Sequence, residues 1–239
     1  MLFISPPFGN YIHLPQTRSI KGSYTLEPRD GLILQILKTL RFSFDKNGWI
    51  NKIGLRNKGL QYGIDNYNHK TDILSIAILN ESEIKPILKM LPETTNIELN
   101  VSCPNINKRL NDKGIGQFLN PQREWCIIKL SPTTENETIE KYYSIGFRQF
   151  HCCNTLPVQG GGLSGPSLIP YVSNMVKFIS QYPNTSIIAG GGIQNMQTLN
   201  KYKNLGAEYF SVSSLFFHPI KSAIFFNNYY KNFKNHNKN

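Results

Sequence analysis

The sequence lacks a long hydrophobic run, and this excludes one broad class of protein. No apolar stretch approaches the roughly 18 to 20 residues that a membrane-spanning helix needs. The first residues, MLFISPPFGNY, contain no basic region, and their apolar stretch is too short for a signal peptide. The sequence therefore predicts a cytoplasmic protein with no membrane partner.

Cysteine and histidine are also scarce. The four cysteines, Cys103, Cys126, Cys152 and Cys153, are too few for a disulfide framework in a chain of 239 residues. They form no CxxC pair, and no His and Cys cluster has the spacing of a zinc site, so no metal is expected. The five histidines lie far apart, and the sequence gives no support for a catalytic histidine with a carboxylate partner.

The chain has fewer acidic than basic residues: it contains 15 Asp and Glu and 26 Lys and Arg. Its formal net charge is therefore +11. Such an excess suggests anionic partners. However, the chain contains no helix-turn-helix, RNP or zinc-finger pattern. The excess of Lys and Asn over Arg is also what an AT-rich coding sequence would give. We favour this compositional explanation and expect no nucleic-acid partner.

What the chain does contain is a series of short apolar runs that are rich in β-forming residues. They are LFISPP, RSIKGSYTL, GWINKIGL, ILSIAIL, NIELNVSC, WCIIKLS, FRQFHCC, TSIIAGG and AEYFSVSSL. Most are continuous rather than alternating, which is typical of strands covered on both faces. Helix-like segments at 81–93, 133–146, 167–183 and 195–207 separate the later runs.

This alternation of strands and helices from about residue 71 onward indicates parallel βαβ units. No GxGxxG motif follows the first strand, which counts against a dinucleotide-binding doubly wound sheet. A single (β/α)8 TIM barrel over residues 1–239 fits the length better. Because only about ten residues separate the first two runs, the N-terminal βα unit should be reduced. Nine candidate strands are one too many, so one of them must belong to a loop.

Polar and small residues gather where the predicted strands end, which is the face that carries the active site in such barrels. These residues are Asn100, Cys103, Asn105, Lys129, Asn154, Thr155, Gly190, Gly191, Gly192, Ser213 and Ser214. A glycine-rich turn before a helix, with a serine-rich turn after the last strand, is typical of a phosphate site. We favour this interpretation over the alternative that the three glycines form only a tight turn.

Cys103 and Lys129 are the candidates for chemistry. Pro104 ends the strand at Cys103, and amides surround the thiol, which suits a base or nucleophile better than a buried hydrophobe. Apolar neighbours imply that Lys129 is largely buried. It could extend to solvent, balance an anionic cofactor or form a Schiff base.

At these residues the pattern resembles the dihydroorotate dehydrogenase family of flavin-dependent βα barrels. The resemblance covers most of the chain, and ELNVSCPN and GGLSG in this order are its most specific motifs. The other matching segments are SYTLEPRDG, WINKIGLRNKG, IIKLSP, NTLPVQGGGLSGP, IIAGGGI and GAEYFSVSSLFFHP. The resemblance also implies that GWINKIGL lies in a loop region after the second barrel strand and carries Asn51 inward.

The resemblance implies FMN-dependent oxidation of dihydroorotate to orotate in pyrimidine biosynthesis. It assigns to the cofactor Lys21, Asn100, Lys129, Gly165, Gly191, Gly192, Ser213 and Ser214, and to the pyrimidine Asn51, Asn100, Asn105, Asn154 and Thr155. Cys103 would take the C5 proton while a hydride leaves C6, and Lys129 would stabilise negative charge on the flavin. A cysteine base marks the soluble class of the family. The implied assembly is a homodimer or a complex with an electron-transfer partner subunit.

The chain also departs from the family pattern. One extra residue separates Lys21 from TLEPR, which leaves the register of this lysine open, and LILQILKTLRF replaces the usual Asn-Pro-x-Pro-Arg segment after PRDG. The chain is also shorter than typical members. Two alternatives remain, namely a related flavoprotein reductase of another dihydropyrimidine and a non-catalytic anion-binding barrel.

Overall fold

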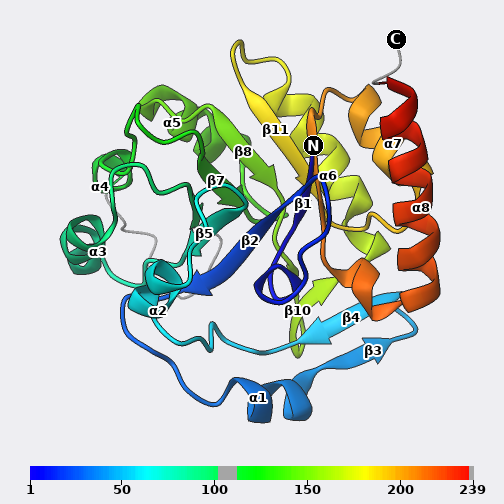
Figure 1. Cartoon of the computed structure of the whole chain (residues 1–239), viewed down its shortest axis with the longest axis horizontal. Helices are drawn as coiled ribbons and strands as arrows, with labels where there is room; N and C mark the ends of the chain where they lie inside the picture. Colours follow the sequence, from blue (N-terminus) through cyan, green and yellow to red (C-terminus); the bar gives the residue numbers. More distant parts are fainter. Residues whose placement is uncertain (102–111, 237–239) are drawn as a thin grey trace.

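Eight parallel strands close into a barrel in the computed structural model, which describes residues 1–101 and 112–236. The barrel strands are β1 (Leu2–Ile4), β2 (Thr17–Tyr24), β5 (Asp72–Ile76), β6 (Ile97–Asn100), β7 (Cys126–Leu130), β8 (Gln149–Cys152), β11 (Ser186–Gly190) and β12 (Tyr209–Val212). Their order around the barrel follows their order in the chain, and β12 pairs with β1 to close it (Figure 1). This is the arrangement of a TIM barrel, and the predicted fold class is confirmed.

Helices cover the outside of the barrel in Figure 1. They are α2 (Leu60–Asp65), α3 (Ile84–Met90), α4 (Asp112–Gly116), α5 (Asn136–Ile145), α6 (Ile169–Ile179), α7 (Met196–Asn204) and α8 (Pro219–His236), with 3-10 turns η2 (Glu81–Glu83), η3 (Pro166–Leu168) and η4 (Ser214–Phe217). The four predicted helical segments are confirmed, although each helix is shorter than its segment. For example, α7 begins at Met196 because the side chain of Asn195 accepts a hydrogen bond from the Thr198 N–H at 2.9 Å.

The connection between β1 and β2 contains a single short turn, η1 (Phe8–Asn10), in place of a full crossover helix. The prediction of a reduced N-terminal βα unit is therefore confirmed. None of the helices in the two described ranges is long and apolar enough to cross a bilayer.

A second, four-stranded sheet lies outside the barrel. Its order is β3 (Arg41–Ser43), β4 (Gly48–Asn51), β10 (Gly161–Ser164) and β9 (Leu156–Val158), and all its pairings are antiparallel. The segment GWIN forms β4, so the prediction that this run does not belong to the barrel is confirmed. Because β4 pairs with β10, the sheet joins the chain after β2 to the chain after β8 (Figure 1).

The interior of the barrel has an apolar floor and a polar layer above it. Phe3, Ile20, Ile73, Trp125, Ile127 and Ile188 form the floor. The ring of Phe3 on β1 lies 5.3 Å from that of Trp125 beside β7, across the barrel. Side chains alternate along a strand, so residues two positions further on also point inward. Those residues include Ser5, Ser75, Lys129 and Gly190. They form the polar layer, which lies nearer the C-terminal ends of the strands than the apolar floor does.

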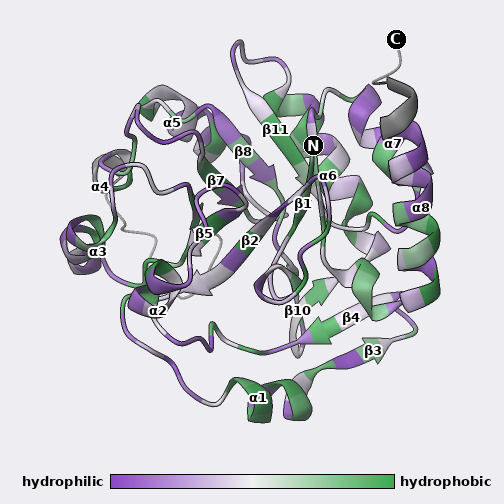
Figure 2. Ribbon diagram, in the orientation of Figure 1, coloured by the Kyte–Doolittle hydropathy of each residue, from purple (hydrophilic) through white to green (hydrophobic). Residues whose placement is uncertain are grey.

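Residues of the opposite parity point outward and pack against the helices. Leu74, Leu99, Ile128 and Phe150 are fully buried in a large cluster that also includes helix residues such as Val176. Figure 2 shows the corresponding apolar stripes on the helices that cover the barrel. The helices therefore hold the strand ends in place, and the interior is left free for polar side chains.

Candidate functional site

A cavity opens at the C-terminal ends of the barrel strands. Its lining includes Ser5, Lys129, His151, Cys153, Asn154, Thr155, Ser164, Gly190, Gly191, Gly192, Ser211, Ser213 and Ser214. These residues come from the ends of β1, β7, β8, β11 and β12 and from β10 of the outer sheet. A wider depression on the outer surface, near Pro132, Tyr171 and Lys177, receives no strand-end residue. The polar groups therefore converge on the cavity at the barrel mouth.

Three ionisable side chains, Glu98, Lys129 and His151, contact one another at the base of this cavity. Glu98 of β6 accepts from Lys129 Nζ of β7 at 3.3 Å through Oε1, and its Oε2 lies 2.5 Å from His151 Nδ1 of β8. Glu98 is completely buried, and His151 is 1 % exposed. Since the carboxylate bridges both partners, it fixes the lysine and the imidazole relative to each other.

Burial and charge together decide the protonation of this cluster. Burial alone would raise the pKa of Glu98, but the charge of Lys129 and the hydrogen bonds from His151 and Ser75 outweigh it and lower that pKa to about 2. Burial lowers the pKa of His151 more than the charge and hydrogen bond of Glu98 raise it. Glu98 is therefore ionised at neutral pH, whereas His151 is neutral and donates its Nδ1–H to the carboxylate.

This tautomer leaves the Nε2 atom of His151 as an acceptor on the cavity side. A Cβ atom at Gly190 would lie 2.7 Å from Nε2 and 3.0 Å from the Cβ of Ser211. Only glycine at position 190 therefore leaves the imidazole edge open to the cavity. His151 and the ammonium of Lys129 present an acceptor and a cation to the same space.

A chain of amides and hydroxyls continues the polar layer on the side of β2, β5 and β6. Asn154 Nδ2 donates to Asn100 Oδ1 at 3.2 Å, and Asn100 Nδ2 donates to Ser23 Oγ at 2.9 Å. Ser23 and Ser75 share a hydrogen bond of 2.8 Å, and Ser75 Oγ donates to Glu98 Oε1 at 2.7 Å. The predicted residues Asn100, Lys129 and Asn154 thus belong to one connected network.

The ends of β11 and β12 supply backbone donors. Within the described part of the chain, the N–H groups of Gly191, Gly192, Ser213 and Ser214 donate no hydrogen bond. At Gly192, φ is +77°, and a Cβ atom would lie 2.7 Å from Ile169 and 3.1 Å from the carbonyl oxygen of Gly165. This turn therefore needs glycine. Unused N–H groups beside a cavity and at the start of a helical turn are suited to an anion such as phosphate.

The structure locates Thr155 in the cavity lining and Gly165 beside Gly192. Asn51 lies at the end of β4, where it pairs with Gly162 of β10, and it is half-buried. Its side-chain oxygen accepts a hydrogen bond of 3.4 Å from the Ile53 N–H. Asn51 is not among the residues that line the cavity, and its role in binding stays a prediction.

The expected position of Lys21 needs a correction. Its ammonium lies 2.7 Å from Asp72 Oδ2 and donates to the backbone oxygen of Asn66 at 3.0 Å. Because Ile20 points into the barrel floor, strand alternation turns Lys21 outward. The pairing of β2 with β5 shifts after Lys21, and Ser23 is the residue that reaches the polar layer. Lys21 is therefore not brought into the candidate site.

Two predicted residues, Cys103 and Asn105, lie outside the described residues. The other cysteines are all buried, as expected for small hydrophobic side chains. Burial raises the pKa of Cys126 and of Cys153 to about 12, and it raises the pKa of Cys152 as well. These three thiols are protonated at neutral pH and are unsuited to act as bases.

Several residues of the site were not predicted from the sequence, among them Glu98, His151, Ser23, Ser5 and Ser211. Glu98 could have been found from its position two residues before Asn100 in one strand, since both side chains must then face the interior. His151 was overlooked because the carboxylate that it contacts lies far from it in the sequence. Its partner Glu98 is 53 positions away and becomes a neighbour only through the pairing of β6, β7 and β8.

Among the described residues, no group of three or more His, Cys, Asp or Glu side chains is arranged to hold a metal ion. The site instead offers one ammonium, one neutral imidazole, several amides and a set of backbone N–H groups. Such a group can bind a planar polar ligand that carries a phosphate, and the ammonium can stabilise negative charge on it.

Comparison with known proteins identified no family model that matches the chain. The chain is similar to the catalytic subunits of dihydroorotate dehydrogenase B (NAD(+)) from several bacteria. It is 29 % identical to that of Desulforamulus reducens, with 87 % of this chain and 78 % of the relative covered. For Bacillus pumilus the identity is 28 %, and the coverage is 80 % and 71 %.

A solved structure is similar over nearly the whole chain. Dihydroorotate dehydrogenase of Eimeria tenella, determined in complex with ferulenol, aligns with a TM-score of 0.65 and covers 93 % of this chain and 78 % of its own. The two sequences are 16 % identical, so this likeness supports the fold alone.

Proposed function

We propose, from the distant homology of this chain to the catalytic subunits of dihydroorotate dehydrogenase B, that it is an FMN-dependent enzyme that oxidises dihydroorotate to orotate. The observation that carries the proposal is the convergence at one barrel mouth of Lys129, the Asn100–Asn154 amide pair and the N–H groups after β11 and β12 that have no acceptor in residues 1–101 and 112–236. We further propose that residues 1–239 act as a single FMN-binding barrel domain.

The residues present fit FMN at two points. The N–H groups of Gly191, Gly192, Ser213 and Ser214 would hold the phosphate, because they have no acceptor among the described residues. Lys129 and Asn100 would hold the flavin ring, with Gly165 close to the phosphate end. When bound, FMN would accept the hydride that leaves C6 of dihydroorotate.

Lys129 would stabilise negative charge on the flavin ring, and Glu98 would keep its ammonium in position. The pair is buried, so the charge of Lys129 acts at short range with little screening by solvent. His151 is neutral in this arrangement and adds a hydrogen-bond acceptor beside the cation. We propose His151 and Glu98 as positioning residues that keep Lys129 in the cavity.

The amides would bind the substrate. Asn100, Asn154 and Thr155, together with Asn51 and Asn105, would hold the pyrimidine, since each amide presents both a donor and an acceptor to ring C=O and N–H groups. The contact between Asn154 and Asn100 keeps the two amides in a fixed orientation. Cys103 would act as the base that removes the C5 proton.

The relatives are named as catalytic subunits of an NAD(+) enzyme. By analogy, we propose that electrons leave this chain through a partner subunit, with a homodimer of the chain as the alternative assembly. The identity of the acceptor can be tested by offering NAD+, fumarate and an artificial dye to the substrate-reduced protein.

The proposal is tested by reconstituting the purified chain with FMN and following flavin absorbance without oxygen. We expect bleaching on addition of dihydroorotate and little or none with dihydrouracil, which lacks the carboxylate. A protein that binds no FMN would refute the proposal. Bleaching only by dihydrouracil would instead assign the chain to the reductases of other dihydropyrimidines.

Replacement of Cys103 gives a sharper test of the mechanism. Cys103→Ala should bind FMN as the unmodified chain does but reduce it about 10²- to 10⁴-fold more slowly, the range for loss of a general base. Cys126→Ala is the matched control, because this buried thiol is at the start of β7, donates to the carbonyl oxygen of Phe118 and does not line the cavity. A normal rate for Cys103→Ala would remove this cysteine from the mechanism.

A further inference from the structure

Helix α1 (Leu32–Thr39) is the part of the fold that the proposed function leaves unexplained. It follows β2 in the segment where LILQILKTLRF departs from the family pattern. None of its residues is buried, although most of them are apolar. In Figure 1 it lies at the lower edge of the molecule, beyond β3 and β4, and Figure 2 shows its hydrophobic colour there.

The exposed apolar side chains of α1 share one face. Ile33 is 74 %, Leu34 is 57 % and Leu37 is 77 % exposed. Ile33 and Leu37 are four residues apart and therefore lie one above the other on the helix surface. We call these three residues the α1 face. Phe44, in the turn at the far end of β3 from α1, is a separate exposed aromatic residue, 88 % exposed.

Polar contacts attach the opposite side of the helix to the chain. Gln35 Nε2 donates to the backbone oxygen of Lys52 at 2.7 Å, and the Lys52 N–H donates to Thr39 Oγ1 at 3.0 Å. The α1 face is therefore directed away from the outer sheet. An eight-residue helix gains little stability from propensity alone, so an apolar face that stays exposed in the described part of the chain indicates an external partner.

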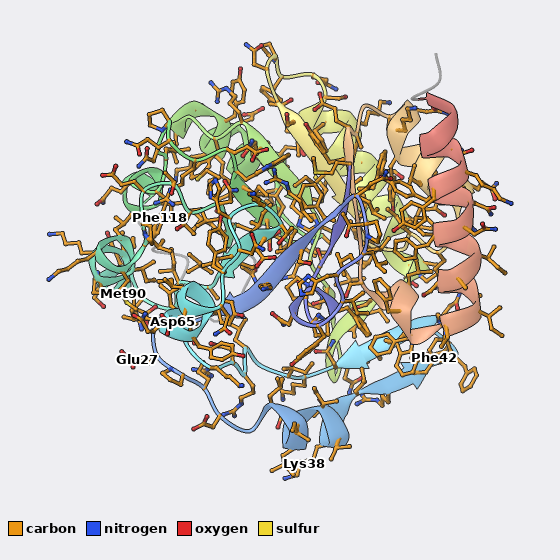
Figure 3. All side chains as sticks on the ribbon, in the orientation of Figure 1. Glu27, Lys38, Phe42, Asp65, Met90 and Phe118 are labelled. Carbon is orange, nitrogen blue, oxygen red and sulfur yellow. The ribbon has the colours of Figure 1, made fainter. Side chains whose placement is uncertain are left out.

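The segment that contains α1 carries a net positive charge, although not all of its basic side chains lie beside the α1 face; Lys58, for example, lies over the ring of Tyr62 on α2. Residues 32–58 contain six basic side chains, Lys38, Arg41, Lys46, Lys52, Arg56 and Lys58, and one acidic side chain, Asp45. Asp45 is already paired with Lys46 at 3.0 Å. Lys38 and Arg41 are exposed at the C-terminal end of the helix, and Figure 3 shows Lys38 projecting away from the rest of the chain. The partner must therefore be anionic.

A second copy of the chain fits these observations poorly. A symmetric contact through the α1 face would bring the same basic residues of two molecules together, which is unfavourable. The face also comprises only three side chains, whereas a stable protein interface uses about 20–30 residues on each side. A lipid surface needs no such area, since it accepts a short apolar insertion beside basic residues.

We propose that α1 is an interfacial helix that docks the protein reversibly on an anionic lipid surface. Ile33, Leu34 and Leu37 enter the boundary between headgroups and acyl chains, while Lys38 and Arg41 contact the headgroups. The helix lies on the membrane and does not span it. This proposal is independent of the proposed enzymatic function, and it differs from the expectation of no membrane partner, which rested on the lack of a spanning segment or signal peptide and on the resemblance to the soluble class.

The test is sedimentation of the full chain with vesicles of phosphatidylcholine that contain phosphatidylglycerol, and with vesicles of phosphatidylcholine alone. We expect binding to the first and little binding to the second, and weaker binding as salt is raised. Ile33→Ser with Leu37→Ser should lower the affinity at least about tenfold. Lys38→Gln with Arg41→Gln should lower it about 25-fold, at about fivefold per basic residue.

Matched controls use residues of the same exposure at other places. Ile220→Ser on α8 removes an apolar side chain that is 78 % exposed, and Lys85→Gln with Lys89→Gln on α3 removes two exposed charges. Both should bind vesicles like the unmodified chain, and circular dichroism and light scattering verify fold and oligomeric state. The proposal is overturned by no binding to anionic vesicles, by equal loss in the controls, or by α1 variants that instead dissociate a dimer.

Discussion

At the scale of single residues, Glu98 connects two ionisable groups of the barrel interior, because it is the carboxylate that contacts both Lys129 and His151. Glu98→Gln would leave the buried ammonium without a countercharge. We expect the free energy of unfolding to fall by about 3–5 kcal/mol, as when one partner of a buried pair is removed. Urea denaturation measures this change.

The matched control for this variant is Glu124→Gln. Glu124 is paired with Arg18 at 2.8 Å, but its side chain is 53 % exposed. Solvent screens such a pair, so the loss should remain below about 1 kcal/mol. Similar small losses for both variants would mean that the Glu98 cluster is not a stabilising element of the fold.

The same carboxylate gives the protein a defined dependence on pH. The pKa of Glu98 is lowered from 4.5 to about 2 in the folded chain, so its contribution to stability is fully present above pH 4.5. It is lost as the pH falls from 4.5 toward 2, because the unfolded chain takes up the proton first. The difference in unfolding free energy between the unmodified chain and Glu98→Gln should therefore shrink over this range. A difference that stays constant would assign the stabilisation to another cause.

At the scale of elements, the turn from β11 into α7 combines a steric requirement with the proposed phosphate site. Gly192→Ala would place a Cβ atom 2.7 Å from Ile169 in a backbone conformation that disfavours any side chain. We expect the turn to shift, and FMN affinity to fall at least about tenfold because the N–H groups no longer converge. Flavin fluorescence titration measures the affinity.

Gly54→Ala is the control for this substitution. Gly54 also has a positive φ, of +69°, but a Cβ atom there would meet only one atom, at 4.0 Å. The variant should lose about 1 kcal/mol of stability from backbone strain and keep its affinity for FMN. If both variants bind FMN normally, the turn after β11 is not part of the phosphate site.

The sequence predicted elements better than it predicted contacts between them. The continuous apolar runs located all eight barrel strands, because short runs of this kind are typical of parallel strands that are covered on both faces. Lys21 points outward by alternation from Ile20, and the irregularity after it brings Ser23 to the polar layer instead, which composition does not reveal. The Glu98–His151 contact depends on strand register across 53 positions.

Helix α1 was not predicted for a related reason. Its segment LILQILKT has the composition of a helix, but among the described residues none of its apolar side chains is buried, and Ile33, Leu34 and Leu37 are exposed. Prediction from apolar periodicity assumes that an apolar face is covered by the core of the same molecule. An element that binds something external violates that assumption, and sequence patterns alone cannot then place it.

At the scale of the whole molecule, a ligand that binds only the folded barrel must stabilise all of it, since the site joins the ends of β1, β7, β8, β11 and β12. At a free FMN concentration of 100 times its dissociation constant, the stabilisation is about 2.7 kcal/mol. For a chain of 239 residues this corresponds to a rise in Tm of roughly 5 to 10 °C. Differential scanning calorimetry with and without FMN measures the shift.

Riboflavin separates the two halves of the proposed site in the same experiment. It has the ring system of FMN but no phosphate, so it can use Lys129 and Asn100 and leaves the N–H groups after β11 and β12 unpaired. At equal concentration it should raise Tm by much less than FMN. Equal Tm shifts with riboflavin and FMN would mean that the flavin ring supplies all the binding energy. Inorganic phosphate is measured as a third ligand, and a Tm shift with phosphate but not with FMN or riboflavin would support the anion-binding alternative. Because the barrel couples these strand ends, calorimetry on the intact chain can distinguish the three outcomes.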